Sequence, residues 1–367
     1  MGSRAPSFGG DNNNRYKHVS IFRTFKSSAG RIFQQLFICL LKRPIEMMDW
    51  LYLIFLFMLT WFIIALVMVI LGDCDLLLQI AEKFGKSPSS LKNKVVWITG
   101  SSSGIGECLA YELSKVGCKL ILSARRKDEL ERVRGQCIEK GGVQADDILV
   151  VPLDMVEFDT HAAAVEKVIN KFGQIDILVN NAGRSQRAEW IKTALEVDQQ
   201  VLNVNVLGVL SLTKLVLPYM IRRNEGHIVN MSSIAGKIGA PFSGSYTGAK
   251  HAIQGWFDAL RIEVLENNIA VTNLCPGPVF SNILDIAFVG EAGKVLKQKM
   301  EPTDKRMKTT RCAELSAIAI ANKLDECWIA LNPVLFLTYA NQYSPVLGKF
   351  VGKKFGLKLM KRLREGR

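Results

Sequence analysis

A tyrosine and a lysine four residues apart form the pattern in this sequence that points most directly to chemistry. Tyr246 and Lys250 lie in the segment GSYTGAK, residues 244–250. On a helix, residues four apart share one face. A free tyrosine has a pKa of about 10, and a cation held nearby favours the phenolate and lowers that pKa toward working pH. Tyr246 is therefore a candidate general acid and base, assisted by Lys250.

Two polar residues upstream could complete such a site. Ser233 follows an apolar, strand-like run, and its hydroxyl could donate a hydrogen bond to a substrate oxygen. Asn205 lies within a long helical pattern over residues 196–222. A tyrosine–lysine spacing alone arises by chance more often than through catalysis. The elements around these residues must therefore support the interpretation.

Short β-branched runs alternate with longer amphipathic stretches from residue 94 to about residue 277. We expect strands at residues 94–99, 119–123, 148–153, 177–180, 227–231 and 270–274. Strands that alternate with helices predict a parallel sheet with helices on both faces. Right-handed crossovers then give an α/β fold with a doubly wound parallel (Rossmann) sheet, which binds ligands at the carboxyl ends of its strands.

The first expected strand runs directly into the glycine-rich loop TGSSSGIG, residues 99–106, and then into a helical pattern. Glycine lets the backbone turn sharply and approach a pyrophosphate closely, and a helix N-terminus offers free N–H groups to that phosphate. The strand–turn–helix context makes this stronger than a lone glycine motif. The predicted dinucleotide contacts in this loop are Thr99, Gly100, Ser102, Ser103, Gly104, Ile105 and Gly106.

The residues that follow the second expected strand bear on which dinucleotide binds. An NAD-selective Rossmann site places an acidic residue there, whereas this sequence has Ala124 followed by Arg125 and Arg126. Arginine suits a 2′-phosphate, which favours NADP(H). The alternative for Arg126 is that it caps an exposed helix start. Asp154, after the third strand, either touches the adenine or caps a helix.

Together these motifs resemble the short-chain dehydrogenase/reductase family, in its non-extended branch with a TGxxxGIG loop, over roughly residues 92–280. The catalytic set that the resemblance implies is Asn205, Ser233, Tyr246 and Lys250. The cofactor contacts that it adds are Tyr246, Lys250, Asn181, Gly183, Pro276, Gly277 and Val279. It also implies that Asn205 anchors a water which relays protons to Lys250.

The segments CPGPV (275–279), SNI (281–283) and MKTTRC (307–312) resemble one membrane-bound branch of that family. This implies an endoplasmic-reticulum enzyme that acts on CH–OH groups and reduces lipophilic carbonyls such as steroids, retinoids and xenobiotics with NADPH. The family also suggests a homodimer. Besides Ser233 and Tyr246, we expect Phe280 to contact substrate, at the start of an apolar wall that extends to about residue 307. Ordinary packing is the alternative for this wall.

Residues 50–72 contain no charged side chain, and about 20 apolar residues suffice to cross a bilayer as a helix. We therefore expect an uncleaved, single-pass transmembrane anchor. Lys42 and Arg43 precede the span, and Asp73 and Asp75 follow it. The positive-inside rule then places the N-terminus in the cytosol and the catalytic domain in the lumen.

The formal net charge of +13 is concentrated toward the two ends of the chain. Basic segments beside apolar ones favour anionic lipid head groups as partners. Nucleic acid is not expected, because the sequence has no zinc finger, RNP motif or continuous basic region. No metal site is expected either, because the eight cysteines form no CxxC pair and the four histidines are scattered.

The expected organisation has five parts. It comprises a basic N-terminal arm (1–49), a transmembrane helix (50–72), a linker (73–93), the Rossmann catalytic domain (94–310) and a helical extension with a basic tail (311–367). Residues 19–41 of the arm form either an interfacial amphipathic helix or a basic segment without fixed structure. The basic tail lies either on the membrane surface or in solvent.

Two other functions compete with this interpretation. A sugar-nucleotide epimerase on the same fold would usually show a GxxGxxG loop and a longer substrate domain, and this sequence has neither. A membrane-bound NADP(H) sensor or scaffold without turnover is the second alternative. The intact set of four catalytic residues argues against a sensor, since binding alone has no physical need for all of them.

Overall fold

A computed structural model describes residues 44–365; the side chains of residues 44–46 and of a few residues in the last helix are not described. The chain divides into two compact units, residues 1–66 and 67–367. The amphipathic segment expected over residues 19–41, and most of the basic arm, lie outside the described residues.

The first described element is the helix α2, Pro44–Leu71. Its stretch Met47–Leu71 is 25 residues long with a mean hydropathy of 3.0, which makes it a candidate membrane span by length and composition. At about 1.5 Å per residue it exceeds the roughly 30 Å of a hydrocarbon core. The apolar span expected at 50–72 therefore forms one continuous helix up to Leu71.

The second unit is built on one sheet of seven parallel strands in the order β3-β2-β1-β4-β5-β6-β7. This confirms the predicted doubly wound Rossmann sheet. The strands are β1 Val95–Thr99, β2 Lys119–Ser123, β3 Ile148–Val150, β4 Ile177–Asn180, β5 Gly226–Met231, β6 Ile269–Pro276 and β7 Glu326–Ile329. The first six correspond to the six expected runs.

Strand β7 was not among the expected strands. It follows the helix α10, Thr309–Ala321, and pairs with β6. With only four residues, one of them Glu326, it shows too little alternation to be recognised from its pattern. The sheet therefore continues beyond residue 310, where the sequence-based boundary of the catalytic domain was placed.

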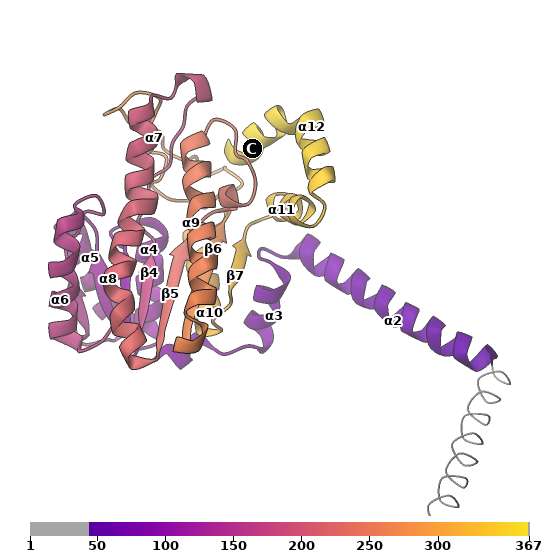
Figure 1. Cartoon of the computed structure of the whole chain (residues 1–367), viewed down its shortest axis with the longest axis horizontal. Helices are drawn as coiled ribbons and strands as arrows, with labels where there is room; N and C mark the ends of the chain where they lie inside the picture. The colour runs from indigo at the N-terminus through magenta and orange to yellow at the C-terminus, as the bar shows by residue number, and fades with distance from the viewer. Residues whose placement is uncertain (1–43, 366–367) are drawn as a thin grey trace, which may run out of the picture. The chain divides into compact units, whose positions relative to one another are not determined.

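Helices cover both faces of the sheet, and each face has its own apolar core. The helices α4 (Gly104–Lys115), α5 (Lys127–Gly141) and α10 pack together on one face. The helices α6 (His161–Phe172), α8 (Gly208–Arg223) and α9 (Gly244–Glu263) cover the other face, and Figure 1 shows α8 and α9 in front of the strands. Strands β1, β4 and β5 are buried along their whole length, as parallel strands between two helix layers must be.

The long helix expected over residues 196–222 is interrupted by one wider turn. The helix α7, Leu195–Leu202, continues through a π-helical turn at Asn203–Leu207 into α8. Segment Leu195–Arg223 is also long and apolar enough for a membrane span, but seven of its apolar side chains are buried in the domain core, namely Val197, Val201, Val206, Val209, Leu212, Val216 and Met220. Single π-turns occur frequently at functional sites, and this one carries Asn205.

The segment expected as a linker at 73–93 contains the helix α3, Leu76–Phe84. Asp75 precedes this helix and joins it to the outer strand. The Asp75 carboxylate accepts a 2.6 Å hydrogen bond from the Trp328 N–H, and the Asp75 N–H donates to the Trp328 carbonyl at 2.8 Å. The chain that follows α2 is thus hydrogen-bonded to β7 at the edge of the sheet.

The C-terminal part forms two helices, α11 (Val334–Tyr343) and α12 (Pro345–Glu365), which contact each other. The side chains of Asn341 and Gln342 both donate to the Lys237 carbonyl, at 3.2 and 3.0 Å. Residues 311–343 therefore belong to the folded unit as α10, β7 and α11. The basic residues of the expected tail lie on α12.

Candidate functional site

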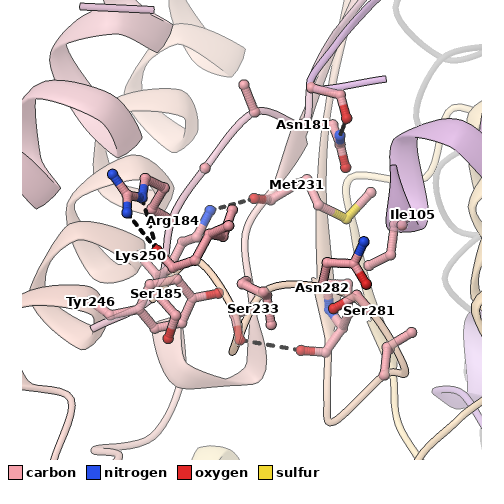
Figure 2. A pocket seen from close by; sticks show the side chains of 18 of the residues that line it. Ile105, Asn181, Arg184, Ser185, Met231, Ser233, Tyr246, Lys250, Ser281 and Asn282 are labelled. Atoms are coloured by element: carbon pink, nitrogen blue, oxygen red, sulfur yellow. Dashed lines mark hydrogen bonds between the residues drawn. The ribbon is translucent and has the colours of Figure 1, made fainter. Parts of the chain in front are cut away.

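A cavity of about 480 Å³ lies at the carboxyl ends of the strands. It extends across β1 and β4, the neighbours at which the strand order reverses and where ligands bind in folds of this kind. Most of the predicted site residues line it, and Figure 2 labels ten of the lining residues around it. Three predicted residues do not line the cavity, namely Gly106, Asn205 and Phe280.

The glycine loop has the backbone that the sequence predicts. Gly100 and Gly104 have φ angles of +66° and +63°, in the left-handed region that favours glycine. A side chain at Gly106 would lie 2.4 Å from the Asn181 Nδ2 atom, so this glycine permits close packing rather than contact with a ligand. Ser103 precedes α4 without capping it through its side chain, so the first N–H groups of α4 are suited to bind an anion.

Asn181 attaches the glycine loop to the end of β4. Its side-chain amide donates to the carbonyl oxygens of Thr99 and Gly100, at 2.9 and 3.2 Å. Its backbone N–H donates to the Thr99 hydroxyl at 3.0 Å. These bonds satisfy loop carbonyls that would otherwise lack partners and hold the loop in its turn.

Both arginines lie at the cavity wall where the sequence predicts the 2′-phosphate site. Arg125 lies 4.0 Å from the Asp154 carboxylate, and Arg126 donates to the Ser102 hydroxyl of the glycine loop at 3.4 Å. Arg126 is the N-cap residue of α5, but its side chain does not cap that helix. Asp154 accepts from the Val156 N–H at 3.2 Å, which closes a turn rather than a helix start. All three charged side chains line the cavity.

Lys250 is buried at the opposite end of the cavity. Its amine donates to the Met231 carbonyl at 2.7 Å, drawn as a dashed line in Figure 2. The same nitrogen lies 5.7 Å from the centre of the Tyr246 ring. Burial lowers the pKa of Lys250 to about 8. The expected tyrosine–lysine pair is therefore brought together on one face of α9.

Tyr246 and Ser233 lie next to each other at the cavity wall. Burial raises the pKa of Tyr246, while a hydrogen bond with the Ser233 hydroxyl and the positive charge of Arg187 act to lower it. The sequence had assigned this lowering to Lys250 instead. The Ser233 hydroxyl also lies 3.2 Å from the Pro276 carbonyl, which orients it at the end of β6.

Asn205 lies behind the cavity wall, next to Gly183. Its side chain accepts from the Arg184 N–H at 2.9 Å and donates to the Arg184 carbonyl at 2.8 Å. A side chain at Gly183 would lie 2.7 Å from the Asn205 Oδ1 atom and 3.7 Å from the Lys250 amine. Asn205 thus holds the turn after β4, and its role in anchoring a water stays a prediction.

Several lining residues were missed from the sequence. Arg184, Ser185 and Arg187 follow the NNAG element at a strand end, and that position alone could have indicated them. Ile286, Met300 and Arg306 come from the loop before α10, and Val334 and Leu337 come from α11. Their approach depends on how the chain folds back, which no local pattern encodes.

The loop before α10 is joined to the segment after β4. The Arg184 guanidinium donates twice to the Ile286 carbonyl, at 3.0 and 2.6 Å, and stacks 3.7 Å from the centre of the Phe288 ring. Phe288 in turn forms a parallel bridge with Gln186. The backbone N–H of Phe280 donates to the Met307 carbonyl at 3.0 Å, and Phe280 is not among the residues that line the cavity, so its contact with substrate stays a prediction.

Comparison with known proteins agrees with this geometry. The family described as short chain dehydrogenase matches residues 94–287. This chain belongs to that family of oxidoreductases, which confirms the resemblance. It is 44% identical over 324 residues to human dehydrogenase/reductase SDR family member 7, across 87% of this chain and 95% of that protein. It is 37% identical over 279 residues to the SDR family protein 7-like of Drosophila melanogaster, across 76% and 84% of the two chains.

Two solved structures show the same fold. An alcohol dehydrogenase of the archaeon Thermococcus sibiricus, complexed with 5-hydroxy-NADP, is 26% identical with a TM-score of 0.56, covering 65% of this chain and 96% of that one. A 3-ketoacyl-(acyl-carrier-protein) reductase of Brucella melitensis, complexed with NADH, is 29% identical with a TM-score of 0.54, covering 63% and 91%. These similar proteins thus bind nicotinamide dinucleotides of both kinds.

The backbone of the glycine loop leads to a first prediction. In Gly100→Ala, the new Cβ would lie 2.7 Å from the Ala182 Cα at a φ of +66°. We expect a loss of about 1–3 kcal/mol in the free energy of unfolding, measured by thermal unfolding of the full chain in detergent. Gly255→Ala, in α9 with open space around it, should be neutral or stabilising by up to about 1 kcal/mol. Equal unfolding midpoints for the two variants would contradict the argument.

Proposed function

We propose that this protein is a membrane-anchored enzyme that reduces lipophilic carbonyl compounds with NADPH and oxidises the corresponding alcohols in reverse. The observation that carries the proposal is the juxtaposition of Tyr246 with Ser233 and Lys250 in a cavity whose other end is the glycine loop. A proton donor and a dinucleotide site in one cavity are the two requirements for carbonyl reduction.

The residues of the cavity fit a dinucleotide with a 2′-phosphate. Two glycines with positive φ give a loop with no side chain in the way, and the start of α4 offers N–H groups for a pyrophosphate. Arg125, Arg126 and Asp154 line this end of the cavity, so two guanidinium groups stand against one lining carboxylate there. This excess of positive charge supports NADP(H) over NAD(H). When bound, NADPH supplies the hydride.

The roles of the chain's own residues follow from their positions. Tyr246 protonates the oxygen of the reduced carbonyl, and Ser233, beside it, donates a hydrogen bond to that oxygen. Lys250, held by the Met231 carbonyl, places positive charge beside the phenol and can hold the nicotinamide ribose. Asn205 positions the turn at Gly183 and Arg184 that borders the reacting groups. Oxidation follows the same steps in reverse.

The substrate end of the cavity supports an apolar substrate. Apolar side chains from three parts of the chain line it, namely Ile238, Ile283, Ile286, Met300, Val334 and Leu337. Steroids, retinoids and xenobiotics with carbonyl groups are the proposed substrate classes. An enzyme with a membrane anchor can take such molecules from the bilayer.

The membrane arrangement is part of the proposal. α2 is long and apolar enough to cross a bilayer once, and the charges around it, Lys42 and Arg43 before and Asp73 and Asp75 after, support a cytosolic N-terminus. We place the catalytic unit in the lumen of the endoplasmic reticulum and expect the basic residues of α12 to contact anionic lipid. The homodimer suggested by the family stays a prediction.

The catalytic role of Tyr246 can be tested by removing one oxygen atom. Tyr246→Phe should lower the rate of NADPH-dependent reduction of a carbonyl panel by roughly 10²–10⁴-fold, because the proton donor is lost, and should leave NADPH binding intact. Tyr343→Phe, at an exposed position on α11, is the matched control and should retain full activity. NADPH binding without Tyr246-dependent turnover would support a sensor or scaffold instead.

The dinucleotide preference depends on Arg125. Arg125→Gln should raise the KM for NADPH about tenfold or more, since a charge-assisted contact to the 2′-phosphate is lost. The KM for NADH should change little. Lys140→Gln, at the far end of α5, is the control for a general loss of positive charge. An equal effect of Arg125→Gln on both cofactors would contradict the assignment.

The proposed facing of the catalytic unit can be tested in sealed microsomes from the endoplasmic reticulum. A tag at the C-terminus should resist added protease while the membrane is intact and be cleaved once detergent opens it. The reason is that the positive-inside rule puts the catalytic unit on the lumenal side. Cleavage of the tag in intact vesicles would place the unit in the cytosol.

A further inference from the structure

Two arginines lie at the substrate end of the cavity, beside the catalytic phenol. Arg187 comes from the segment after β4, and Arg306 comes from the loop before α10; both line the cavity. They are close enough to interact, since the charge of Arg306 acts to lower the pKa of Arg187, and the charge of Arg187 acts to lower the pKa of Tyr246. Neither arginine has a role in the steps described above.

The charges at this end of the cavity do not balance. Arg306 is paired with Asp304, with 2.8 Å between its Nε atom and the carboxylate. No carboxylate lies within ion-pair distance of Arg187 among residues 44–365. Asp285 lines the cavity too, but at an exposed position. Burial lowers the pKa of Arg187 only to about 10, so this residue stays a cation at neutral pH.

The side chain of Arg187 is held in place by neutral groups. Its Nη1 atom donates to the Ser243 hydroxyl at 2.6 Å and to the Gln186 carbonyl at 3.3 Å. Its backbone N–H donates to the Phe288 carbonyl at 2.8 Å. Within the described part of the chain, its Nε and Nη2 atoms make no hydrogen bond. A positioned guanidinium with free donors suits an anion, and a desolvated cation gains from one.

We propose that the substrate carries an anionic group, such as a carboxylate, a short distance from its carbonyl, and that Arg187 binds this group. This inference rests on the proposed function and narrows the substrate class to amphipathic oxo acids. The carbonyl lies at Tyr246 and Ser233, the acid group reaches Arg187, and the apolar body packs against Ile286, Met300 and Leu337. Arg187 is then a specificity-determining residue.

Matched acids and amides test this with the full chain in detergent and NADPH. The probes are 3-benzoylpropionate, 4-benzoylbutyrate and 5-benzoylpentanoate, each with its primary amide, so that only the charge differs within a pair. For at least one chain length, the acid should have a kcat/KM about tenfold or more above that of its amide, as expected for a charge-assisted contact. The series is needed because the distance from carbonyl to acid is not specified by Arg187 alone.

Variants at position 187 test whether Arg187 causes the preference for the acid over its amide. Arg187→Gln should remove the preference for the acid, measured as the ratio of kcat/KM for the acid to kcat/KM for its amide. An effect of Arg187 on Tyr246 acts on both substrates and cancels in this ratio. Arg187→Lys should keep part of it, because an ammonium retains the charge but not the two-pronged geometry. Arg222→Gln, an exposed arginine on α8, is the matched control and should behave as the unaltered chain does.

The outcomes separate this inference from the proposed function. Turnover of the amides, or of retinal and a steroid ketone, without any preference for the acids would overturn the inference alone. A preference that survives in Arg187→Gln would also overturn it. If no carbonyl compound is reduced, both the proposed function and this inference are wrong. Should Arg187→Gln not fold, the inference is still tested by the ratio of kcat/KM for the acid to kcat/KM for its amide. This ratio is measured in the unaltered chain and in Arg187→Lys.

Discussion

All seven strands of the catalytic sheet run parallel, so all of their carboxyl ends lie along one edge. That constraint places the glycine loop after β1, the arginines after β2, the Asn181 turn after β4, and Ser233 after β5 around one cavity. The amide of Asn181 then holds the loop to β4. A single change of strand direction would carry one of these groups to the opposite edge, some 15 Å away for a five-residue strand.

Positive charge dominates both ends of the cavity. At the dinucleotide end, Arg125 and Arg126 line the cavity with Asp154; at the substrate end, Arg306 is paired with Asp304, while Arg187 has no carboxylate within ion-pair distance among residues 44–365. Lys250, Arg187 and Arg306 are desolvated by the walls of the cavity, whereas Arg125 and Arg126 are exposed. An anionic ligand therefore gains more at the substrate end than it would at an open surface. Both the proposed preference for NADP(H) and the inferred acid group of the substrate rest on this excess of charge.

The residues that follow α2 are bound firmly to the catalytic unit. Arg311 on α10 forms ion pairs with Asp73 and Glu82, both at 2.6–2.7 Å, and Asp75 is hydrogen-bonded to Trp328 at the outer strand. Residues 73–84, which the sequence predicts as part of a linker, are therefore attached to α10 and to the edge of the sheet.

Local patterns were enough to identify six strands, the glycine loop, and the pair of Tyr246 and Lys250, because each depends on residues near one another in the chain. They missed β7, which is too short to show a period, and the apolar type of Phe280 does not reveal whether its side chain lines the cavity. The partners of Asn205 and Arg187, the rise in the pKa of Tyr246, and the wall from α11 depend on burial and on charges far apart in sequence. Residue types and spacing thus determined what chemistry this protein can carry. Only the tertiary structure decided which charges lack a partner, because desolvation and Coulomb energies depend on distance in space.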